Sequence, residues 1–295
     1  METLTTCPVC SKNELTDYIK CKDFTVSGNW FNIQHCSNCS FLFTNPRPDQ
    51  NEIGPYYKSD NYISHSNKSN GLFNKTYQFI RNIAINKKIE LIKSLFTGKE
   101  DIKLLDIGCG TGEFLSACAK SGWEVEGVEP SEDARSKAKE LHQLKVNDED
   151  SLEINQKQYD VITMWHVLEH VHSLNKRIDQ LSKLIAKNGH VIIAVPNHTS
   201  QDAGEFKENW AAWDVPRHLY HFSPSTIKKI MSNHGFKHIK SMPMVFDSYY
   251  VSLLSTQYEA GSKNYLKGVW TGWRSNQSAG KNAENYSSVI YIFTK

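Results

Sequence analysis

The stretch that most constrains the fold is LLDIGCGTGEFL, residues 104–115, where three glycines separate an apolar run from a helical pattern. Gly108, Gly110 and Gly112 let the backbone turn tightly and approach a ligand closely. The spacing D-x-G-x-G-x-G differs from G-x-G-x-x-G, and it contains no P-loop lysine. Asp106 favours a ligand with positive charge, such as an ammonium or sulfonium ion, over a pyrophosphate. The stretch therefore predicts a strand, a ligand-binding turn and a helix.

Short apolar runs alternate with helical patterns along most of the remaining chain. Their periodicity predicts strands at 103–108, 124–129, 159–165, 190–196, 236–246 and 287–295, and helices at 72–96, 112–122, 131–142, 174–186 and 223–235. We expect Asn188-Gly189 to end the 174–186 helix, and residues 247–286 to be helical at first and Gly/Asn/Ser-rich afterwards. This alternation predicts right-handed β-α-β crossovers and a mostly parallel α/β sheet covered by helices on both faces.

The glycine loop and the segments on its C-terminal side resemble class I S-adenosylmethionine-dependent methyltransferases. Residues 104–112 match the first motif of that family, Tyr159–Val171 its fourth-strand motif and residues 184–197 its fifth strand. Glu129 ends the next strand, 21 residues after Gly108, and matches the acid that holds the ribose hydroxyls. The resemblance implies a Rossmann-like fold with a seven-stranded, mostly parallel sheet. Open alternatives are an ordinary Rossmann turn that binds NAD, or a turn without a ligand.

The same resemblance implies a set of residues around S-adenosylmethionine. They are Asp106, Gly108, Cys109, Gly110, Thr111, Gly112, Glu129, Pro130, Asp150, Trp165 and His166. Asp150 is chosen as the contact to the adenine amino group, although a solvated acidic loop is the alternative. Cys109 is a small loop residue and not a nucleophile, because no activating base is identifiable. His170 and its neighbour Glu169 recur in such sequences, where they often serve loop packing.

Two cysteine pairs near the N-terminus, Cys7/Cys10 and Cys36/Cys39, have the spacing C-x2-C-x25-C-x2-C. Four thiolates from two tight turns suit a closed tetrahedral Zn²⁺ site, which is structural because it leaves no open coordination position. The chain between the pairs has enough β-forming residues for a short hairpin, as in a zinc ribbon. Buried or disulfide-linked cysteines are the alternative.

The N-terminal region also looks like the zinc-binding module of bacterial sugar C-methyltransferases. That group places a Tyr and a His three residues apart on the substrate, and Tyr62 and His65 match this spacing, with a Tyr-rich linker as the alternative. The group also carries a YHEHF segment after the fifth strand. Here its catalytic Glu falls on Tyr220 or on Arg217, and the group's extra C-terminal domain is absent, so C-methylation of a ketosugar is not supported.

The segment WDVPRHLYHF, residues 213–222, concentrates polar and aromatic side chains after the fifth strand. We expect part of a lid over the methyl group, with His218 or His221 as the general base and Arg217 on an acceptor anion. Trp213 and Tyr220 are expected to wall the substrate pocket. His166, His65 and Tyr62 are the other catalytic candidates. In the structural alternative Asp214 pairs with Arg217 and the aromatic residues pack against the sheet.

These patterns divide the chain into three expected parts. They are a zinc-binding module at 1–45, a connector and helical segment at 46–98, and a methyltransferase domain at 99–295 with substrate-covering insertions at 199–222 and 247–286.

The charge balance restricts the partners of this chain. It has 34 basic and 32 acidic residues, a net charge of +2, which gives no sign of a nucleic-acid or membrane partner. The start lacks the features of a secretory signal, and no run approaches ~18 apolar residues. We therefore expect a cytoplasmic enzyme acting on a sugar, lipid precursor or secondary metabolite. An RNA methyltransferase that uses the zinc module for recognition, and a non-catalytic binding module, are the alternatives.

Overall fold

The computed structural model describes residues 1–58 and 72–295. Its strands are β1 (Leu15–Lys22), β2 (Trp30–Cys36), β3 (Leu42–Thr44), β4 (Lys103–Ile107), β5 (Glu124–Val128), β6 (Val146–Asn147), β7 (Tyr159–Trp165), β8 (Ile185–Pro196), β9 (Tyr220–His221), β10 (Lys237–Pro243) and β11 (Ser288–Thr294). The sequence predicted β4, β5, β7, β8, β10 and β11, and these predictions are confirmed.

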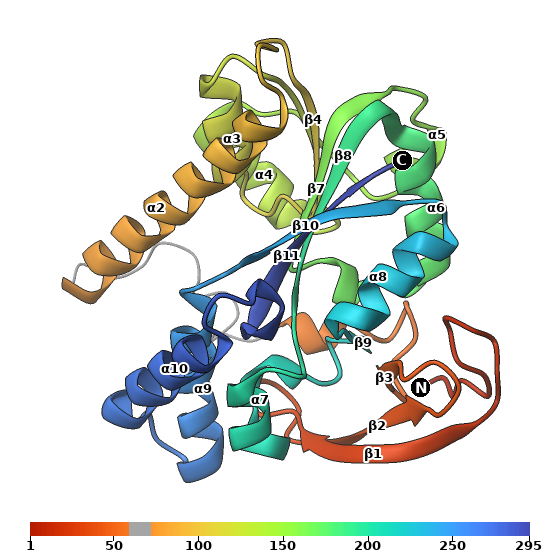
Figure 1. The fold of residues 1–295 in the computed structure, drawn as a ribbon, viewed down its shortest axis with the longest axis vertical. Coiled ribbons are helices and arrows are strands. Elements are labelled where there is room, and N and C mark those ends of the chain that lie inside the picture. The colour runs from red at the N-terminus through yellow and green to blue at the C-terminus, as the bar shows by residue number, and fades with distance from the viewer. Residues whose placement is uncertain (59–71) are drawn as a thin grey trace. The chain divides into compact units, whose positions relative to one another are not determined.

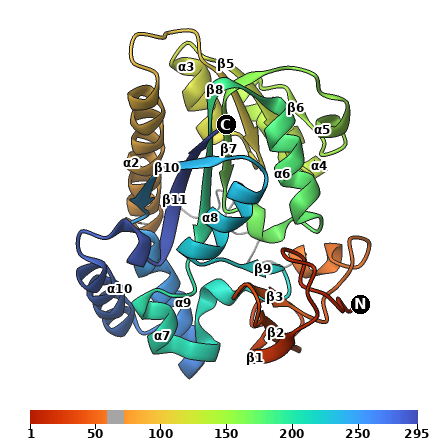
Figure 2. The ribbon, with the colours of Figure 1, turned by 45° about the vertical axis from the view of Figure 1, so that its right-hand side comes forward.

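Along the chain, helices connect most of these strands (Figures 1 and 2). The α-helices are α2 (Leu72–Leu95), α3 (Glu113–Lys120), α4 (Glu132–His142), α5 (Ser151–Ile154), α6 (Leu174–Leu184), α7 (Gln201–Phe206), α8 (Pro224–Asn233), α9 (Asp247–Ala260) and α10 (Tyr265–Ala279). Short 3-10 turns are η1 (Gly54–Tyr57), η2 (Leu168–His170), η3 (Lys207–Asn209), η4 (Ala211–Trp213) and η5 (Ala283–Asn285). In the part of the chain described, no helix combines the length and the apolar character that crossing a bilayer requires.

A seven-stranded sheet carries the predicted α/β fold, in the order β10-β11-β8-β7-β4-β5-β6. β4 lies between β5 and β7 and pairs parallel with both, so Asp106 stands opposite Gly127 on one side and Thr163 on the other. Strands in this order place the carboxyl ends of β4, β5 and β7 along one edge. Ligands of doubly wound sheets lie outside that edge.

The described residues form two compact units that interleave along the chain. Unit 2 comprises residues 72–165, 180–192 and 294–295, and unit 1 comprises residues 1–58, 166–179 and 193–293. In unit 2, α3 packs on β5, and α2 packs on α3. The domain boundaries expected from the sequence stay a prediction.

Unit 1 contains a second, four-stranded sheet in the order β1-β2-β3-β9. β1 and β2 form the predicted antiparallel hairpin, with Leu15 opposite Cys36. β3 pairs with β9, so that Phe43 lies opposite Tyr220. The strands near the N-terminus therefore share a sheet with the segment that comes after β8, a connection that local patterns in the sequence did not reveal.

The second half of residues 247–286, for which the sequence indicated only a Gly/Asn/Ser-rich composition, forms the helix α10. Glycine normally weakens a helix, but here it lets two helices pack closely. A Cβ added at Gly268 would lie 2.8 Å from Leu253 Cα, and one at Gly272 would lie 2.8 Å from Tyr249 Cα. The glycines are therefore required by the contact between α9 and α10.

The end of α6 differs from the sequence expectation. The helix ends at Leu184 and not at Asn188-Gly189, although Asn188 does adopt the left-handed conformation, with φ +65°. Ile185 is buried in the extended conformation of β8. An apolar residue at position 185 fits both a longer α6 and the start of β8. The apolar periodicity therefore cannot locate the end of α6.

Candidate functional site

The glycine loop of unit 2 has the conformation that its sequence predicts. Gly108, Gly110 and Gly112 have φ values of +73°, +57° and +84°, a region that side chains disfavour. Glu129 Oε2 accepts a hydrogen bond from Gly110 N at 2.9 Å, and its Oε1 accepts one from Ser131 N at 2.9 Å. The carboxylate after β5 is thus fixed against the loop after β4.

The space beside this loop fits a ligand that approaches the backbone. A Cβ added at Gly110 would meet nothing within 4 Å, whereas one at Gly112 would lie 2.8 Å from Leu144 Cδ1. Gly112 therefore serves the packing of the loop on the protein, and Gly110 faces open space. Thr111 donates to Glu113 Oε2 at 2.6 Å and helps to close the turn.

Asp106 lies beneath the loop and is 2% exposed. Burial raises its pKa to about 7, although a hydrogen bond from Thr163 Oγ1 at 2.6 Å acts in the opposite direction. A cationic ligand placed nearby would stabilise the ionised carboxylate. Burial also raises the pKa of Cys109 well above its usual value, which agrees with its expected role as a loop residue.

Three other predicted cofactor residues of unit 2 lie at or shortly after the ends of strands. Trp165 ends β7, packs edge-on against Phe114 with ring centroids 5.5 Å apart, and has Lys88 Nζ 4.0 Å from its own centroid. Its buried Nε1 has no hydrogen-bond partner among the residues described. Asp150 is exposed at the start of α5, just after β6. Pro130 follows Glu129 directly, and its carbonyl oxygen accepts a hydrogen bond from Arg135 at 2.8 Å.

His166 follows Trp165 directly and belongs to unit 1. Its φ of +56° is unusual for a residue with a side chain, and such strain is concentrated at functional sites. Its Nε2 lies 3.0 Å from Asp247 Oδ2, and its Nδ1 lies 3.3 Å from Glu169 Oε1. Burial lowers the pKa of His166, but the two carboxylates outweigh this and raise it to about 10. With 34% of its side chain exposed, this imidazole is open to solvent.

Asp247 is a site residue that the sequence analysis missed. It is the first residue of α9, 81 positions after its partner, and no local motif surrounds it. Only the three-dimensional structure brings its carboxylate to His166.

Glu169, His170 and His218 converge in unit 1, with possible ligand atoms within 4.8 Å of one another. The Nδ1 atoms of His170 and His218 lie 3.0 and 2.8 Å from backbone carbonyl oxygens, so each Nδ1–H donates there. Glu169 Oε2 is buried and has no hydrogen-bond partner within the described ranges. Burial lowers the pKa of His170 to about 4. These side chains could hold a cation or a shared proton.

Arg217 is 1% exposed and lies between two carboxylates. It makes five hydrogen bonds of 2.5–3.2 Å: two to Asp214, two to Asp23 and one to Tyr56 O. A guanidinium group has five N–H donors, so none remains for an acceptor anion. The structure favours the ion-paired alternative for Arg217, and its role in substrate binding stays a prediction.

The other residues expected in the lid are also covered by protein. Trp213, His218, Tyr220 and His221 are 3%, 8%, 1% and 4% exposed. Burial lowers the pKa of His221 well below its usual value, and its Nε2 lies 3.1 Å from Thr44 Oγ1. Of the histidines proposed as bases within the described residues, His166 is the most accessible. Tyr62 and His65 lie outside the described residues.

The four predicted metal ligands converge in unit 1. Cys7 Sγ lies 3.5 Å from Cys39 Sγ, and Cys10 Sγ lies 3.5 Å from Cys36 Sγ. These separations exceed a disulfide bond and approach the ~3.8 Å between sulfurs on a tetrahedral Zn²⁺ with Zn–S bonds of about 2.3 Å. Burial raises the pKa of Cys7 to about 11, so a nearby cation is required to keep it a thiolate. The cluster fits a structural zinc ion.

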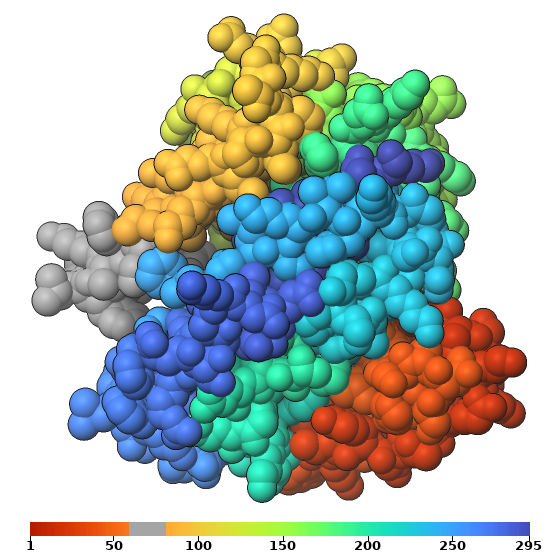
Figure 3. Space-filling model, in the orientation of Figure 1, coloured from red at the N-terminus to blue at the C-terminus, as the bar shows by residue number. Residues whose placement is uncertain are grey.

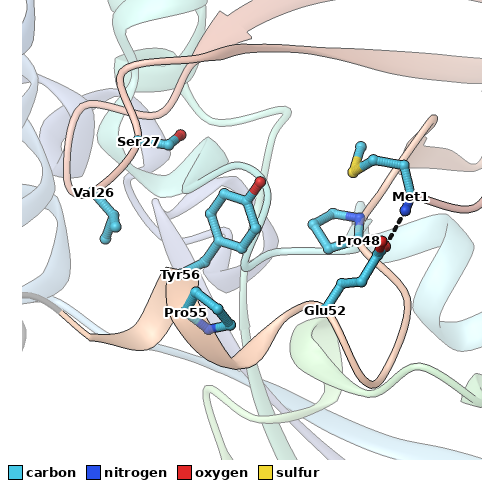
Figure 4. A pocket seen from close by; sticks show the side chains of 7 residues that line it. All are labelled: Met1, Val26, Ser27, Pro48, Glu52, Pro55 and Tyr56. Atoms are coloured by element: carbon cyan, nitrogen blue, oxygen red, sulfur yellow. Dashed lines mark hydrogen bonds and ion pairs between the residues drawn. The ribbon is translucent and has the colours of Figure 1, made fainter.

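A pocket of about 380 Å³ lies elsewhere in unit 1, and Figure 4 shows its lining. The lining residues are Met1, Val26, Ser27, Pro48, Glu52, Pro55 and Tyr56. None of them is a predicted site residue. The N-terminal amine forms an ion pair with Glu52 in its lining.

Comparison with known proteins identifies a related family. The sequence model of the family described as "Methyltransferase domain" matches residues 79–241. The ubiquinone biosynthesis O-methyltransferase of Rickettsia bellii is 31% identical over 208 residues, which cover 63% of this chain and 80% of that protein. The enzyme of the same name from Vibrio atlanticus is 36% identical over 135 residues, or 43% of this chain and 55% of that protein.

Solved structures show the same fold. Magnesium protoporphyrin IX methyltransferase from Synechocystis, with bound S-adenosylhomocysteine, gives a TM-score of 0.55 at 15% identity, covering 84% of this chain and all of that one. Haemonchus contortus phosphoethanolamine N-methyltransferase 2 gives 0.53 at 20% identity, covering 86% of this chain and 62% of that one. The N-terminal likeness to sugar C-methyltransferases stays a prediction.

Proposed function

Because the chain belongs to the methyltransferase domain family and is a class I S-adenosylmethionine-dependent methyltransferase, we propose that it methylates a hydroxyl group of a small molecule. The observation that supports this choice is His166, an accessible imidazole between two carboxylates directly after β7. The relatives named above are O-methyltransferases, and a hydroxyl nucleophile must lose a proton during transfer.

In this proposal the cofactor-binding residues of unit 2 and the histidine of unit 1 have separate tasks. S-adenosylmethionine supplies an activated methyl group on a sulfonium. Glu129 holds the ribose hydroxyls, the loop at Gly110 lies against the remainder of that molecule, and Trp165 donates from Nε1 or packs against it. Asp247 orients the His166 ring by accepting a hydrogen bond from its Nε2 at 3.0 Å. In the deprotonated imidazole, Nδ1 exchanges its 3.3 Å contact with Glu169 for the acceptor hydroxyl and takes the proton of that hydroxyl.

The acceptor class can be tested with methyl-labelled S-adenosylmethionine and separated small-molecule and RNA extracts. We expect label in the small-molecule fraction, in a product that resists base hydrolysis as an ether does. Label in RNA, together with salt-sensitive RNA binding, would support the alternative of an RNA methyltransferase. A protein that binds S-adenosylmethionine but labels neither fraction would contradict the proposal.

We expect His166→Gln to lower kcat by ~10²–10⁴-fold, because removing a general base has effects of that size. The pKa of about 10 predicts that the wild-type rate rises with pH towards 10 as the imidazole loses its proton. Asp247→Asn removes a carboxylate that raises this pKa, so the rising limb of the pH–rate profile should move to lower pH. A residue that only packs would leave the profile unmoved.

His234→Gln is the matched control, since His234 Nδ1 also faces a carboxylate, Asp179, at 2.8 Å. We expect this variant to keep the wild-type rate and pH profile. The raised pKa of His166 also affects stability. Its protonated ring stabilises the folded protein below about pH 6.5, and this stabilisation is lost as the pH rises through about 10. If His166→Gln turns over normally, the base must be sought at another residue.

We also propose that Cys7, Cys10, Cys36 and Cys39 hold one structural Zn²⁺ per chain. The Cys36→Ser/Cys39→Ser variant should lose the metal in elemental analysis, and a chelator should lower the melting temperature of the wild type. Cys118→Ala, which alters a buried cysteine outside the cluster, is the control and should retain one equivalent. Metal that is absent from the wild type, or undiminished in the double variant, would exclude the site.

A further inference from the structure

The helix α10 of unit 1 carries its apolar side chains on the outside. Tyr265, Leu266, Val269, Trp270 and Trp273 are 58%, 86%, 57%, 57% and 43% exposed. Their spacing places them on one face of the helix. A helix of a globular protein normally directs such a stripe into the core. We call these five residues the outer face of α10.

The inner face of α10 is small and polar instead. Its buried residues are Gly268, Thr271, Gly272, Ser275, Asn276 and Ala279. Thr271 donates to Glu205 at 2.9 Å, and Ser275 donates to the buried carboxylate of Asp202 at 2.7 Å. The two glycines lie against the backbone of α9, as described above. The inner face therefore makes its contacts inside the protein. Rotating α10 to bury its apolar side would break these hydrogen bonds and the close packing on α9.

The outer face is therefore a permanent apolar surface. Figures 1 and 2 show α10 beside α9, and Figure 3 shows both helices at the surface in blue. Trp270 and Trp273 stack with ring centroids 5.0 Å apart, so their side chains form one continuous aromatic surface. Tryptophan and tyrosine are the side chains enriched where water meets a lipid bilayer, since one end is apolar and the other polar.

Basic residues lie within α10 and next to both of its ends in the sequence. Residues 261–281 contain Lys263, Lys267, Arg274 and Lys281 and no Asp or Glu, although the whole chain has only two more basic than acidic residues. Two of the four have carboxylate partners from other elements: Lys267 pairs with Glu259, and Arg274 lies 3.6 Å from Glu205. Within residues 1–58 and 72–295, no ion pair involves Lys263 or Lys281. These two lysines flank the ends of the helix and leave a positive rim.

We propose that the outer face of α10 docks on the surface of a membrane containing anionic lipids. The apolar side chains enter the headgroup region, and the flanking lysines pair with lipid phosphates. Docking of this kind needs no spanning segment, so it is compatible with the absence of such a helix among the described residues. A membrane partner was not expected from the net charge or from the lengths of the apolar runs, because neither property reports the direction in which one helix face points.

The test is sedimentation of the full chain with vesicles of phosphatidylcholine alone and of phosphatidylcholine with phosphatidylglycerol. We expect binding to the anionic vesicles at least tenfold stronger than to the neutral ones, and about tenfold weaker in 0.5 M salt than in 0.05 M salt. Trp270→Gln/Trp273→Gln should reduce binding at least tenfold to either vesicle. Lys263→Glu/Lys281→Glu should reduce it mainly for the anionic vesicles.

Trp30→Gln is the matched control, because Trp30 is 54% exposed on β2 and lies outside the outer face. Melting temperatures and S-adenosylmethionine binding check that each variant folds. Equal binding by wild type and Trp270→Gln/Trp273→Gln, or no binding by the wild type, would overturn the proposal. Sedimentation velocity adds a separate outcome: a wild-type dimer that this variant dissociates, without vesicle binding, would assign the face to a second copy of the chain.

Discussion

Substituting Gly110 by Val should reduce the affinity for S-adenosylmethionine at least tenfold, and Glu129→Ala should reduce it about 100-fold. Gly110 has φ +57°, a conformation that a β-branched residue rarely adopts, and a side chain there would fill the space left open for the ligand. In the proposed site the Glu129 carboxyl group accepts hydrogen bonds from two ribose hydroxyls, and two such bonds account for about 3 kcal/mol. Isothermal titration calorimetry measures both effects.

The controls separate binding from folding. An added Cβ at Gly54 meets nothing within 4 Å, and this residue has no positive φ, so Gly54→Ala should bind as the wild type does. Gly112→Ala should behave differently, because its Cβ would collide with Leu144 Cδ1. We expect this variant to lower the melting temperature more than it lowers the affinity for S-adenosylmethionine. Wild-type affinity in both Gly110→Val and Glu129→Ala would refute the assignment of the loop.

The features that the sequence predicted well are those set by neighbouring residues. The strand, glycine turn and helix around Gly110 depend on local periodicity and on positive φ values that glycine permits, so the sequence states them directly. The start of the predicted helix at Ser223 and the two C-x2-C turns are equally local. For the same reason the family resemblance, which rests on these motifs, predicted the fold correctly.

The features that the sequence did not reveal depend on contacts between distant segments. The pair of His166 and Asp247 joins residues that no short motif relates. The composition of residues 265–279 did not indicate α10, because only the neighbouring backbone of α9 explains why a helix needs glycines there. Segment 213–222 was expected to be a lid from its polar composition, but Arg217 uses its charge on Asp23, 194 positions away. Composition shows which groups are available and does not show their partners.

Replacing Arg217 by Met should destabilise the protein by about 3–5 kcal/mol, because it removes one partner from a buried ion cluster. Asp23 is 1% exposed, and the guanidinium lies 3.2 Å from its Oδ1 and 2.5 Å from Asp214 Oδ1. Burial raises the pKa of Asp214, but Arg217 outweighs this and holds it below its usual value. The stabilisation that the ionised Asp214 contributes is therefore present above about pH 4 and is lost as the pH falls further. Urea unfolding at pH 7 and at about pH 2 measures both effects.

Arg274→Met provides the comparison, since Arg274 is 45% exposed and its pair with Glu205 is a surface one, so the expected change is within about 1 kcal/mol. Adding Asp23→Asn and Asp214→Asn to Arg217→Met should recover part of the loss, because it removes the uncompensated buried charges. The opposite pattern has a clear meaning. If Arg217→Met unfolds as the wild type does but raises the KM of the acceptor, the arginine must exchange a carboxylate for the substrate, and the role predicted for it from the sequence is correct.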